Sequence, residues 1–484
     1  MAYKHGLYGS IIPSVEDITT AKNIPVYIGT CPMHRVEKVN RSINKPILIK
    51  NMQDAIRKTG YSLSDNFEEF SLSATIYAHF QNSIEPIGPI VLINVLNTEK
   101  AITENIEVDV IKNIGIIKKH VLIDSIEIQD KVIDEDYELE YTQEGNLKIK
   151  FIEKEKKEIV NGKISISCKV LDPTITEGDI VGTYNEKDET RTGILAVQDV
   201  YEELNVVPTI LSAPGWNEKV KVRQALVSAT KKITDRWEAI AFTDIPIENV
   251  KNIDEAIKWK KESGYNSNEE KTFWPKGIMG GKEMYLSILG IVAKMQTDVK
   301  YDNIPYQTPS NKKIDISGLT LGKGNHIKFS QNRANELNAH GITTAIYNGG
   351  KYVLWGPHMA NFEDGVTSKP EEIFDTNIMM HKYLLNDFQV RNTGVIDSSM
   401  NRHDVDSIMN SEQMILDAHV ISGHLLYGKI NFIQTNNPNN DIINGNFTFN
   451  TLVTNTPIAK SITQNIQYTS LGISKAYAPK EDEE

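Results

Sequence analysis

Two separate stretches of this chain alternate strand-like apolar runs with helical patterns, and a stretch of different periodicity separates them. In 25–99, the continuous apolar run at 89–96 is typical of a strand buried on both faces of a mainly parallel sheet. In 205–368, the strand-like runs 206–211 and 238–242 are each followed by a helical pattern. Repeated strand–helix units predict an α/β fold with a mainly parallel sheet covered by helices.

Residues 100–200 differ, because apolar and polar side chains alternate there with a period of two. Residues 137–142 and 147–151 show this alternation on either side of the turn 143–146. Such a pattern predicts a hairpin with one face in water. Further strand-like runs in the same stretch predict an antiparallel, β-sandwich-like domain inserted into the chain, which makes the protein multidomain and α+β overall.

The sequence pattern in 369–455 predicts two helices. One begins at Pro370, and a longer one covers 405–420. Beyond it, 456–484 contains a strand-like run at 458–469 with apolar residues at even positions and a strongly acidic end. These apolar residues are Ile462, Ile466 and Tyr468.

The N-terminal segment 1–24 is extended in character, with apolar residues scattered among glycine, serine and proline. These residues are Tyr3, Leu7, Tyr8, Ile11 and Ile12. Such sparse apolar residues cannot build a core of their own. Either the segment is a frayed terminus or it is an arm that adds a strand to another sheet, and composition alone slightly favours fraying.

Composition excludes several classes of function. The chain of 484 residues has 52 basic and 64 acidic residues, a net charge of −12, and no basic run, which disfavours direct nucleic-acid binding. The longest apolar runs are too short for a membrane-spanning helix, and we expect no secretory signal at the start. Cys31 and Cys168 lie far apart, so we expect free thiols and folding in a reducing cytoplasm.

Catalytic motifs are imperfect or missing. Residues 318–324 and 277–283 are similar to phosphate-binding loops, but each has one residue too few between its glycines and no Ser or Thr after the lysine. The closest match to a hydrolase nucleophile turn is 472–476, and His419 and His424 lack the spacing of metal ligands. The sequence therefore predicts no catalytic residue, no cofactor and no metal site.

Five short motifs occur in order along the chain. They are HGLYG at 5–9 followed by Pro13, PVYIGT at 25–30, PTILSAPG at 208–215, GHLLYGKINF at 423–432 and NPNNDIING at 437–445. Together, over nearly the whole length, they resemble the sheath protein of contractile phage tails and of the related R-type bacteriocins.

This resemblance implies a structural protein that polymerises helically around an inner tail tube and contracts to drive the tube through the target cell envelope. It implies a subtilisin-like sheath domain without a catalytic triad at 205–368, an inserted domain on the outer surface, and a tube-facing domain at 369–455. Candidate tube-facing residues are His424, Tyr427 and Lys429.

The resemblance also makes 1–24 and 456–484 arms that add strands to neighbouring subunits. The arm contacts would be Tyr3, Leu7, Tyr8, Ile11, Ile12, Ile462, Ile466 and Tyr468. The implied partners are further copies of the chain, the tube protein, and baseplate and tail terminator proteins at the ends. The implied location is a virion tail assembled in the host cytoplasm.

Two other interpretations stay open on sequence grounds. One is an α/β nucleotide-dependent hydrolase with an accessory β module, and the other is a shell or surface-layer subunit that assembles into flat arrays. The sequence does not distinguish an infectious phage from a tail-like bacteriocin.

Overall fold

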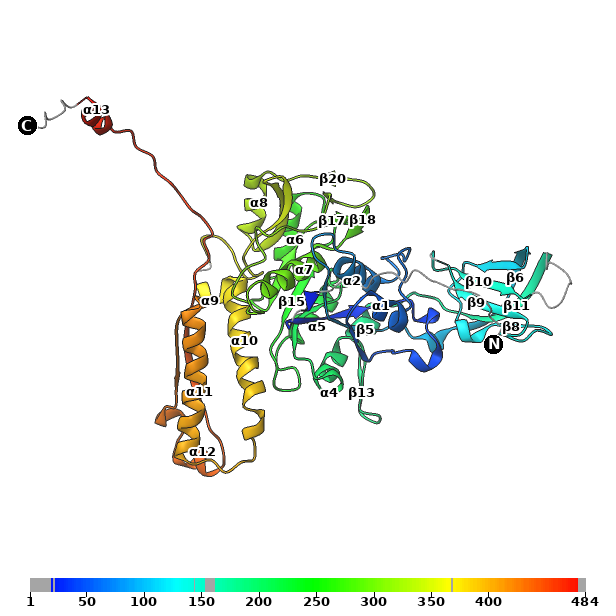
Figure 1. Ribbon diagram of the computed structural model, residues 1–484, viewed down its shortest axis with the longest axis horizontal. Coiled ribbons are helices and arrows are strands. Elements are labelled where there is room, and N and C mark those ends of the chain that lie inside the picture. The colour runs from blue at the N-terminus through cyan, green and yellow to red at the C-terminus, as the bar shows by residue number, and fades with distance from the viewer. Residues whose placement is uncertain (1–18, 21, 143, 153–161, 367–368, 478–484) are drawn as a thin grey trace, which may run out of the picture.

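The computed structural model describes residues 19–20, 22–142, 144–152, 162–366 and 369–477. Three folded parts lie in a row: an inserted β domain, a central α/β domain and a C-terminal part dominated by two long helices (Figure 1). A C-terminal segment leaves the body beside the long helices and extends away from it. The multidomain α/β architecture that the sequence predicts is confirmed.

Eight strands form the central sheet in the order β22-β21-β16-β15-β14-β2-β5-β3. The six strands from β21 to β5 run parallel, and an antiparallel strand closes each edge. Because β14 pairs with β2, the two α/β stretches of the sequence form one domain that the insert interrupts. The strands are β2 (Ile24–Gly29), β3 (Pro46–Ile49), β5 (Ile90–Asn94), β14 (Pro208–Ser212), β15 (Ile240–Asp244), β16 (Glu270–Phe273), β21 (Ile342–Asn348) and β22 (Lys351–Trp355).

Side chains of the central strands alternate between two apolar cores. Tyr27 belongs to one core, whereas its neighbours Val26 and Ile28 belong to the other. The first core is covered by α1 (Met52–Thr59), α2 (Ser71–Phe80) and α7 (Leu286–Val299). The second is covered by α3 (Glu177–Val181), η5 (Gly193–Asp199), α4 (Val200–Leu204) and α5 (Val220–Ser228). Burial of 286–298 on every side explains why this helix is apolar nearly all round.

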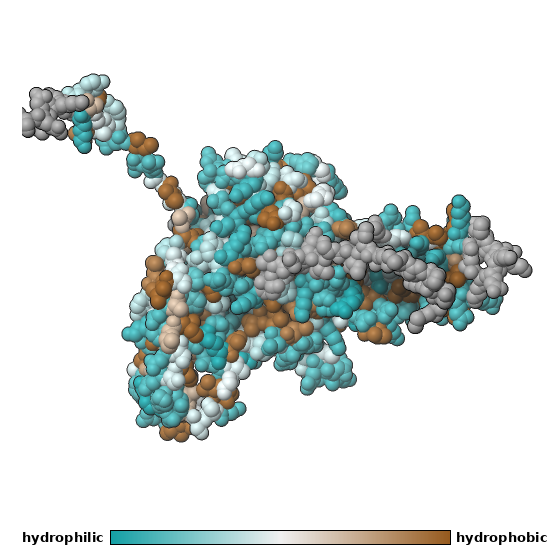
Figure 2. Space-filling model, viewed as in Figure 1, coloured by the Kyte–Doolittle hydropathy of each residue, from teal (hydrophilic) through white to brown (hydrophobic). Residues whose placement is uncertain are grey.

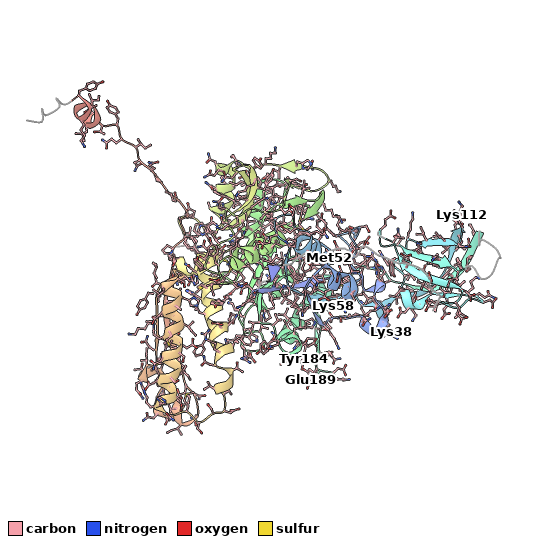
Figure 3. The ribbon with its side chains drawn as sticks, viewed as in Figure 1. Lys38, Met52, Lys58, Lys112, Tyr184 and Glu189 are labelled. Carbon is pink, nitrogen blue, oxygen red and sulfur yellow. The ribbon has the colours of Figure 1, made fainter. Side chains whose placement is uncertain are left out.

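Smaller elements complete the central domain. The helices α6 (Ile253–Glu262) and α8 (Gln331–Asn338) pack around Trp274. A four-stranded antiparallel sheet consists of β17 (Lys276–Met279), β18 (Lys282–Met284), β19 (Gly318–Thr320) and β20 (His326–Ile327). A short hairpin, β12 (Tyr184–Asn185) and β13 (Thr190–Arg191), projects from the domain, with Tyr184 and Glu189 labelled on it in Figure 3.

The inserted domain is one six-stranded antiparallel sheet in the order β8-β11-β6-β7-β10-β9. Its strands are β6 (Ile102–Ile111), β7 (Ile114–Ile117), β8 (Glu127–Ile128), β9 (Tyr137–Tyr141), β10 (Leu147–Phe151) and β11 (Gly162–Val170). The two edge strands of this sheet are β9 and β8. Tyr137 Oη on β9 donates to the carbonyl of Ile126, which directly precedes β8, at 3.4 Å. The described sheet therefore curls around a single core instead of forming the two facing sheets of the expected sandwich.

The hairpin expected from the alternation is present, because Leu147 pairs with Tyr141 and Phe151 pairs with Tyr137. Residues 177–200, which the sequence predicts to be part of the inserted domain, pack against the central sheet instead. The physical reason is that apolar residues such as Ile180 and Val200 lie on short helices that cover the second core.

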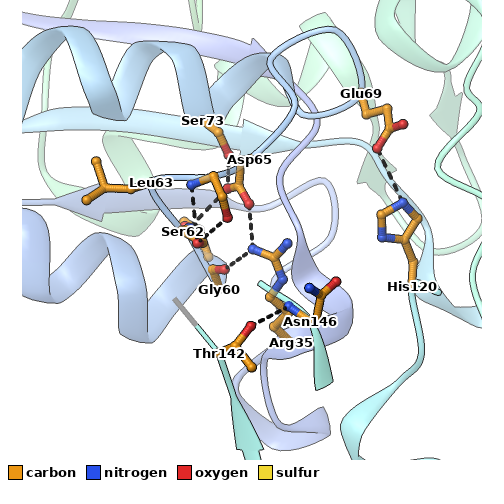
Figure 4. Close-up of polar contacts among 12 residues, drawn as sticks. Arg35, Gly60, Ser62, Leu63, Asp65, Glu69, Ser73, His120, Thr142 and Asn146 are labelled. Atoms are coloured by element: carbon orange, nitrogen blue, oxygen red, sulfur yellow. Dashed lines mark hydrogen bonds and ion pairs between the residues drawn. The ribbon is translucent and has the colours of Figure 1, made fainter. Parts of the chain in front are cut away.

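The junction between the inserted domain and the central domain contains a cluster of polar side chains, and the contact between His120 and Glu69 crosses it (Figure 4). Arg35 Nη1 donates to Asp65 Oδ1 at 2.5 Å and to the carbonyl of Gly60 at 3.0 Å. The Arg35 guanidinium also approaches the ring of Tyr141 in the insert. His120 of the insert lies with Nε2 3.3 Å from Glu69 Oε2 of the central domain. The inserted domain and the central domain therefore have separately packed cores, and ionic and cation–π contacts connect them at this junction.

The C-terminal part contains α9 (Pro370–Ile373), α10 (Asp375–Arg391), α11 (Arg402–Ile421), β23 (Leu425–Asn431), α12 (Asn439–Ile443) and β24 (Asn450–Asn455). The strands β23 and β24 pair antiparallel, and their apolar side packs on α10 and α11 around Met380, Leu416 and Ile430. The sequence motifs at 423–432 and 437–445 thus form one strand and the turn that leads to its partner. The pairing itself is not evident from the sequence.

Candidate functional site

The C-terminal segment beyond β24 is the most unusual surface feature of the described chain. After its first residues, the segment 456–470 leads away from the body in an extended path (Figure 1). Ile462, Ile466 and Tyr468 are 87%, 86% and 82% exposed. Figure 2 shows brown, apolar side chains spaced along this segment. The predicted strand at 458–469 is absent from the described chain, because its backbone has no neighbouring strand to pair with.

Contacts at its root direct the segment away from the domain that carries it. Thr456 Oγ1 donates to the carbonyl of Gly423 at 2.7 Å. Lys460 Nζ lies over the ring of Phe362, 5.7 Å from its centroid, on the central domain. These two contacts pull the first residues of the segment past the end of α11 and against the central domain.

The segment ends in a short helix, α13 (Leu471–Ala476), that the sequence analysis does not predict. Leu471, Ile473 and Tyr477 are 68%, 55% and 84% exposed there. By its sequence, 472–476 is only an imperfect match to a nucleophile turn. The signal that could have indicated a helix is the pair Ile473 and Tyr477 at i,i+4 spacing, which is weak over so few residues.

An open groove with a volume of about 700 Å³ lies between α10, α11 and β24, and we call it the C-terminal groove. Its apolar lining consists of Leu384, Leu385, Phe388, Ile415, Leu416, Phe449, Leu452 and Val453. Leu385 is 47% exposed and Leu452 is 58% exposed. Charged side chains at its border include Arg391, which pairs with Glu412 at 2.5 Å. Such a groove is suited to apolar side chains from another segment.

The candidate tube-facing residues lie on or beside β23, but they do not all reach the surface. Tyr427 is 48% exposed and Lys429 is also exposed. His424 is only 9% exposed, because it packs between Tyr306 and His419. The structure therefore contradicts a surface role for the His424 side chain in this conformation.

His419 and His424 form a buried pair at the base of the C-terminal segment. Their Nδ1 atoms are 3.1 Å apart, which places one ring N–H in a hydrogen bond to the other ring. Burial, together with the neighbouring His424 ring and the Arg391 guanidinium, lowers the pKa of His419 to about 4. The pair is thus neutral at pH 7, and its hydrogen bond fastens the turn that leads into β23.

Within the described residues, the two stretches that are similar to phosphate-binding loops do not form such a site. The arm residues Tyr3, Leu7, Tyr8, Ile11 and Ile12 lie outside the described residues. Residues 277–283, which are similar in sequence to a phosphate-binding loop, form the β17–β18 hairpin. Residues 318–324, the second such stretch, lie within β19 and the connection to β20. Neither loop leads directly into a helix, which a phosphate-binding loop requires.

Two further findings concern only the part of the chain that the structure describes. There, no group of three or more His, Cys, Asp and Glu side chains is arranged to hold a metal ion. No helix in the same residues has the length and apolar character needed to cross a bilayer. Both cysteines in this part of the chain are buried free thiols.

Comparison by sequence finds neither a matching protein-family model nor a matching curated protein. Comparison by structure gives matches that span nearly the whole chain. One is a chain of the anti-feeding prophage (AFP) baseplate in a 6-fold symmetrised cryo-EM structure, with a TM-score of 0.59 and 11% identity, covering 97% of this chain and 100% of that one.

A second match is a chain of the PVC sheath complex, an extracellular contractile injection system in the contracted state. It has a TM-score of 0.56 and 12% identity, and it covers 98% of this chain and 99% of that one. A third is a chain of the AFP baseplate in the contracted state, with a TM-score of 0.56 and 10% identity over 96% and 99% of the two chains. The chain thus has the fold found in contractile injection systems, and its resemblance to contractile sheath proteins is confirmed at the level of the fold.

Proposed function

We propose that this chain is a structural and mechanical subunit of a contractile sheath. Copies polymerise helically around an inner tail tube, and the sheath contracts to drive the tube through the target cell envelope. The observation that carries this proposal is the shared fold over 98% of the chain with a chain of a sheath complex in its contracted state. The site supports no chemistry that would favour the hydrolase alternative.

The terminal segments link the copies by strand exchange in this proposal. A helical polymer needs contacts in which one patch meets a different patch on the next copy. The segment 456–470 has unpaired backbone groups and one apolar side, with Ile462 and Ile466 at even positions and polar residues between them. Those features suit a strand that joins the sheet of another molecule.

Each exchanged strand makes a weak joint. Four to six backbone hydrogen bonds at about 0.5–1.5 kcal/mol each contribute only a few kcal/mol before apolar burial. Many such joints make a lattice cooperative while allowing each copy to rotate against its neighbour. The N-terminal residues Tyr3, Leu7, Tyr8, Ile11 and Ile12 would supply the second arm.

The domains have separate positions in the proposed assembly. The C-terminal part faces the tube, with Tyr427 and Lys429 as the exposed candidates, and the inserted domain lies on the outer surface. The central domain corresponds to a subtilisin-like sheath domain without a triad. Baseplate and terminator proteins cap the polymer in a tail that is assembled in the bacterial cytoplasm.

Negative-stain electron microscopy of the purified full-length protein tests the proposal. We expect tubes or striated sheaths at high protein concentration. Discrete particles at every concentration would support an isolated enzyme, and flat sheets would support a surface-layer subunit. Either result would contradict a sheath.

The role of the C-terminal segment is tested by the double variant Ile462→Ser/Ile466→Ser. Both side chains are exposed, so we expect an unchanged circular dichroism spectrum together with loss of tubes. The matched control is Ile396→Ser/Ile443→Ser, which changes two side chains that are 74% and 80% exposed elsewhere on the C-terminal part. Loss of tubes in the control as well would show that the C-terminal segment has no specific role in assembly.

A further inference from the structure

Beyond strand exchange, the apolar end of the C-terminal segment has no role in the proposed function. The six residues of α13 form a helix far too short to be stable alone in water. Helices of this length persist when an apolar side packs on another surface. Ile473 and Tyr477, which share one side at i,i+4 spacing, are nevertheless both more than half exposed, so the surface that covers this side is not part of their own described chain.

The C-terminal groove is an apolar surface of the complementary kind. Its volume of about 700 Å³ is within the range of pockets that enclose several side chains. Leu385 on α10 and Leu452 on β24 expose about half of their surface to it. Glu371 at its border is exposed, and Lys475 of α13 offers it an opposite charge.

We infer that the C-terminal groove of one copy receives α13 of a second copy. This inference rests on the proposed function, because it needs the segment to cross between copies. It adds a helix-in-groove contact at the end of the segment, separate from strand pairing by 458–469. The contact would determine which neighbouring copy each segment binds. A pocket selects particular side chains, whereas backbone hydrogen bonds between strands do not depend on the side chains.

The path of the segment favours a second copy over the groove of the same chain. Thr456 is held by Gly423, and Lys460 lies on Phe362 of the central domain, so the segment starts in a direction away from its own groove. The 15 residues from 456 to 470 span at most about 50 Å when extended. That reach is sufficient for an adjacent molecule, and Figure 1 shows α13 well clear of its own body.

Disulfide trapping in the full-length protein tests the contact directly. One chain carries Leu385→Cys and a second chain carries Ile473→Cys, and the two are mixed under assembly conditions and oxidised. The native thiols of Cys31 and Cys168 are buried and should not compete. We expect a disulfide-linked dimer of the two chains. A chain with Ile443→Cys in place of Leu385→Cys is the control and should give no dimer with Ile473→Cys.

Three results would overturn the inference. The first is tubes that form normally without any disulfide between positions 385 and 473. The second is a double variant that closes the disulfide within one chain at high dilution, because the groove would then hold the helix of its own molecule. The third is preferential trapping of Leu385→Cys by Leu7→Cys, which would assign the groove to the N-terminal segment.

A non-covalent variant separates this inference from the proposed function. Leu385→Glu places a charge in the groove without touching the strand segment, and we expect about a tenfold or greater rise in the concentration needed for assembly. Ile396→Glu is the control at a similarly exposed site. Assembly of Leu385→Glu at the wild-type concentration would contradict the groove contact while leaving the sheath proposal intact, whereas a wild type without tubes would contradict the sheath proposal.

Discussion

Lys271 Nζ lies 2.9 Å from Asp375 Oδ2, and both side chains are completely buried. Lys271 is on β16 in the central sheet, and Asp375 is the first residue of α10. The same ammonium donates to the carbonyls of Gly356 and His358. This ion pair fastens the C-terminal part to the central domain, so that a displacement of one is passed to the other.

Breaking this pair should be strongly destabilising. Lys271→Met leaves Asp375 as a buried charge without its ammonium, and we expect a loss of about 3–5 kcal/mol in the free energy of unfolding. Urea denaturation of the unassembled protein measures it. Lys271→Met/Asp375→Leu should recover most of the loss, because no uncompensated charge remains. Arg402→Met removes an exposed pair with Asp406 and should cost less than about 1 kcal/mol.

Gly145→Ala should loosen the docking of the inserted domain. Gly145 has φ +73°, and an added Cβ would lie 2.4 Å from Arg35 Nη2. The substitution thus combines backbone strain with displacement of the guanidinium that binds Asp65. Gly365→Ala is the matched control, because Gly365 has φ +75° with nothing within 4 Å of its Cβ.

We expect Gly145→Ala to lower the thermal midpoint more than Gly365→Ala, by an amount that corresponds to about 1–3 kcal/mol. Limited proteolysis at 171–176 should also become faster in Gly145→Ala alone. Equal effects of the two substitutions would mean that the approach to Arg35 is unimportant.

His79 should make the protein less stable at acidic pH. Its Nε2 is 2.7 Å from Tyr27 Oη and its Nδ1 is 3.1 Å from the carbonyl of Ile87, deep in the first core. Burial lowers the pKa of His79 to about 4, below the unfolded value of about 6.5. The unfolded chain therefore binds the proton first, and stability falls as the pH decreases from about 6.5 to 4.

The full effect is about 3 kcal/mol, because one pKa unit corresponds to 1.36 kcal/mol. The free energy of unfolding of His79→Gln, measured across this pH range, should decrease less than that of the wild type by this amount. His403→Gln changes an exposed histidine and should follow the wild type. Parallel curves for His79→Gln and the wild type would contradict the assignment.

Asp244 should change the free energy of unfolding with pH in the direction opposite to His79. Burial raises the pKa of its carboxyl to about 6, against the hydrogen bonds from Ser287 and Asn217 that favour the ionised form. The folded chain therefore binds this proton first, and the contribution of Asp244 to stability rises as the pH falls from about 6 to 4. Above pH 6 that contribution, about 3 kcal/mol, is lost.

Asp244→Asn removes this titration. Relative to the variant, the wild type should gain stability as the pH decreases from about 6 to 4, in chemical denaturation measured at a series of pH values. Asp109→Asn, at an exposed strand position, provides the comparison. A wild type that loses stability relative to Asp244→Asn over this range would show that the carboxyl is ionised in the folded protein well below pH 6.

Local patterns in the sequence were sufficient for much of the architecture. The alternation at 137–142 and 147–151 predicted the β9–β10 hairpin, because both strands and their turn are neighbours in sequence. The apolar run at 89–96 predicted a buried strand, and β5 is buried along its whole length. These features depend on periodicity, which neighbouring residues determine by themselves.

Contacts between distant residues decided the rest. His424 was expected at the surface, but Tyr306 and His419 enclose it, and only the packing of α11 against the 301–306 loop brings them together. The sequence predicts that residues 177–200 belong to the insert, yet their apolar side chains cover the central sheet. Pairing of β23 with β24 creates the groove, whereas 458–469 has a strand pattern and no partner in its own chain.

The sequence by itself therefore determined the periodic elements, the charge balance and the apolar pattern of the C-terminal segment. The tertiary structure decided which of those elements share a core, which side chains are buried, and that the C-terminal segment extends away from its own body beyond its first contacts. The reason is that burial and strand pairing depend on residues that are far apart in the sequence. A local sequence pattern does not show which distant residues will pack against it or pair with it.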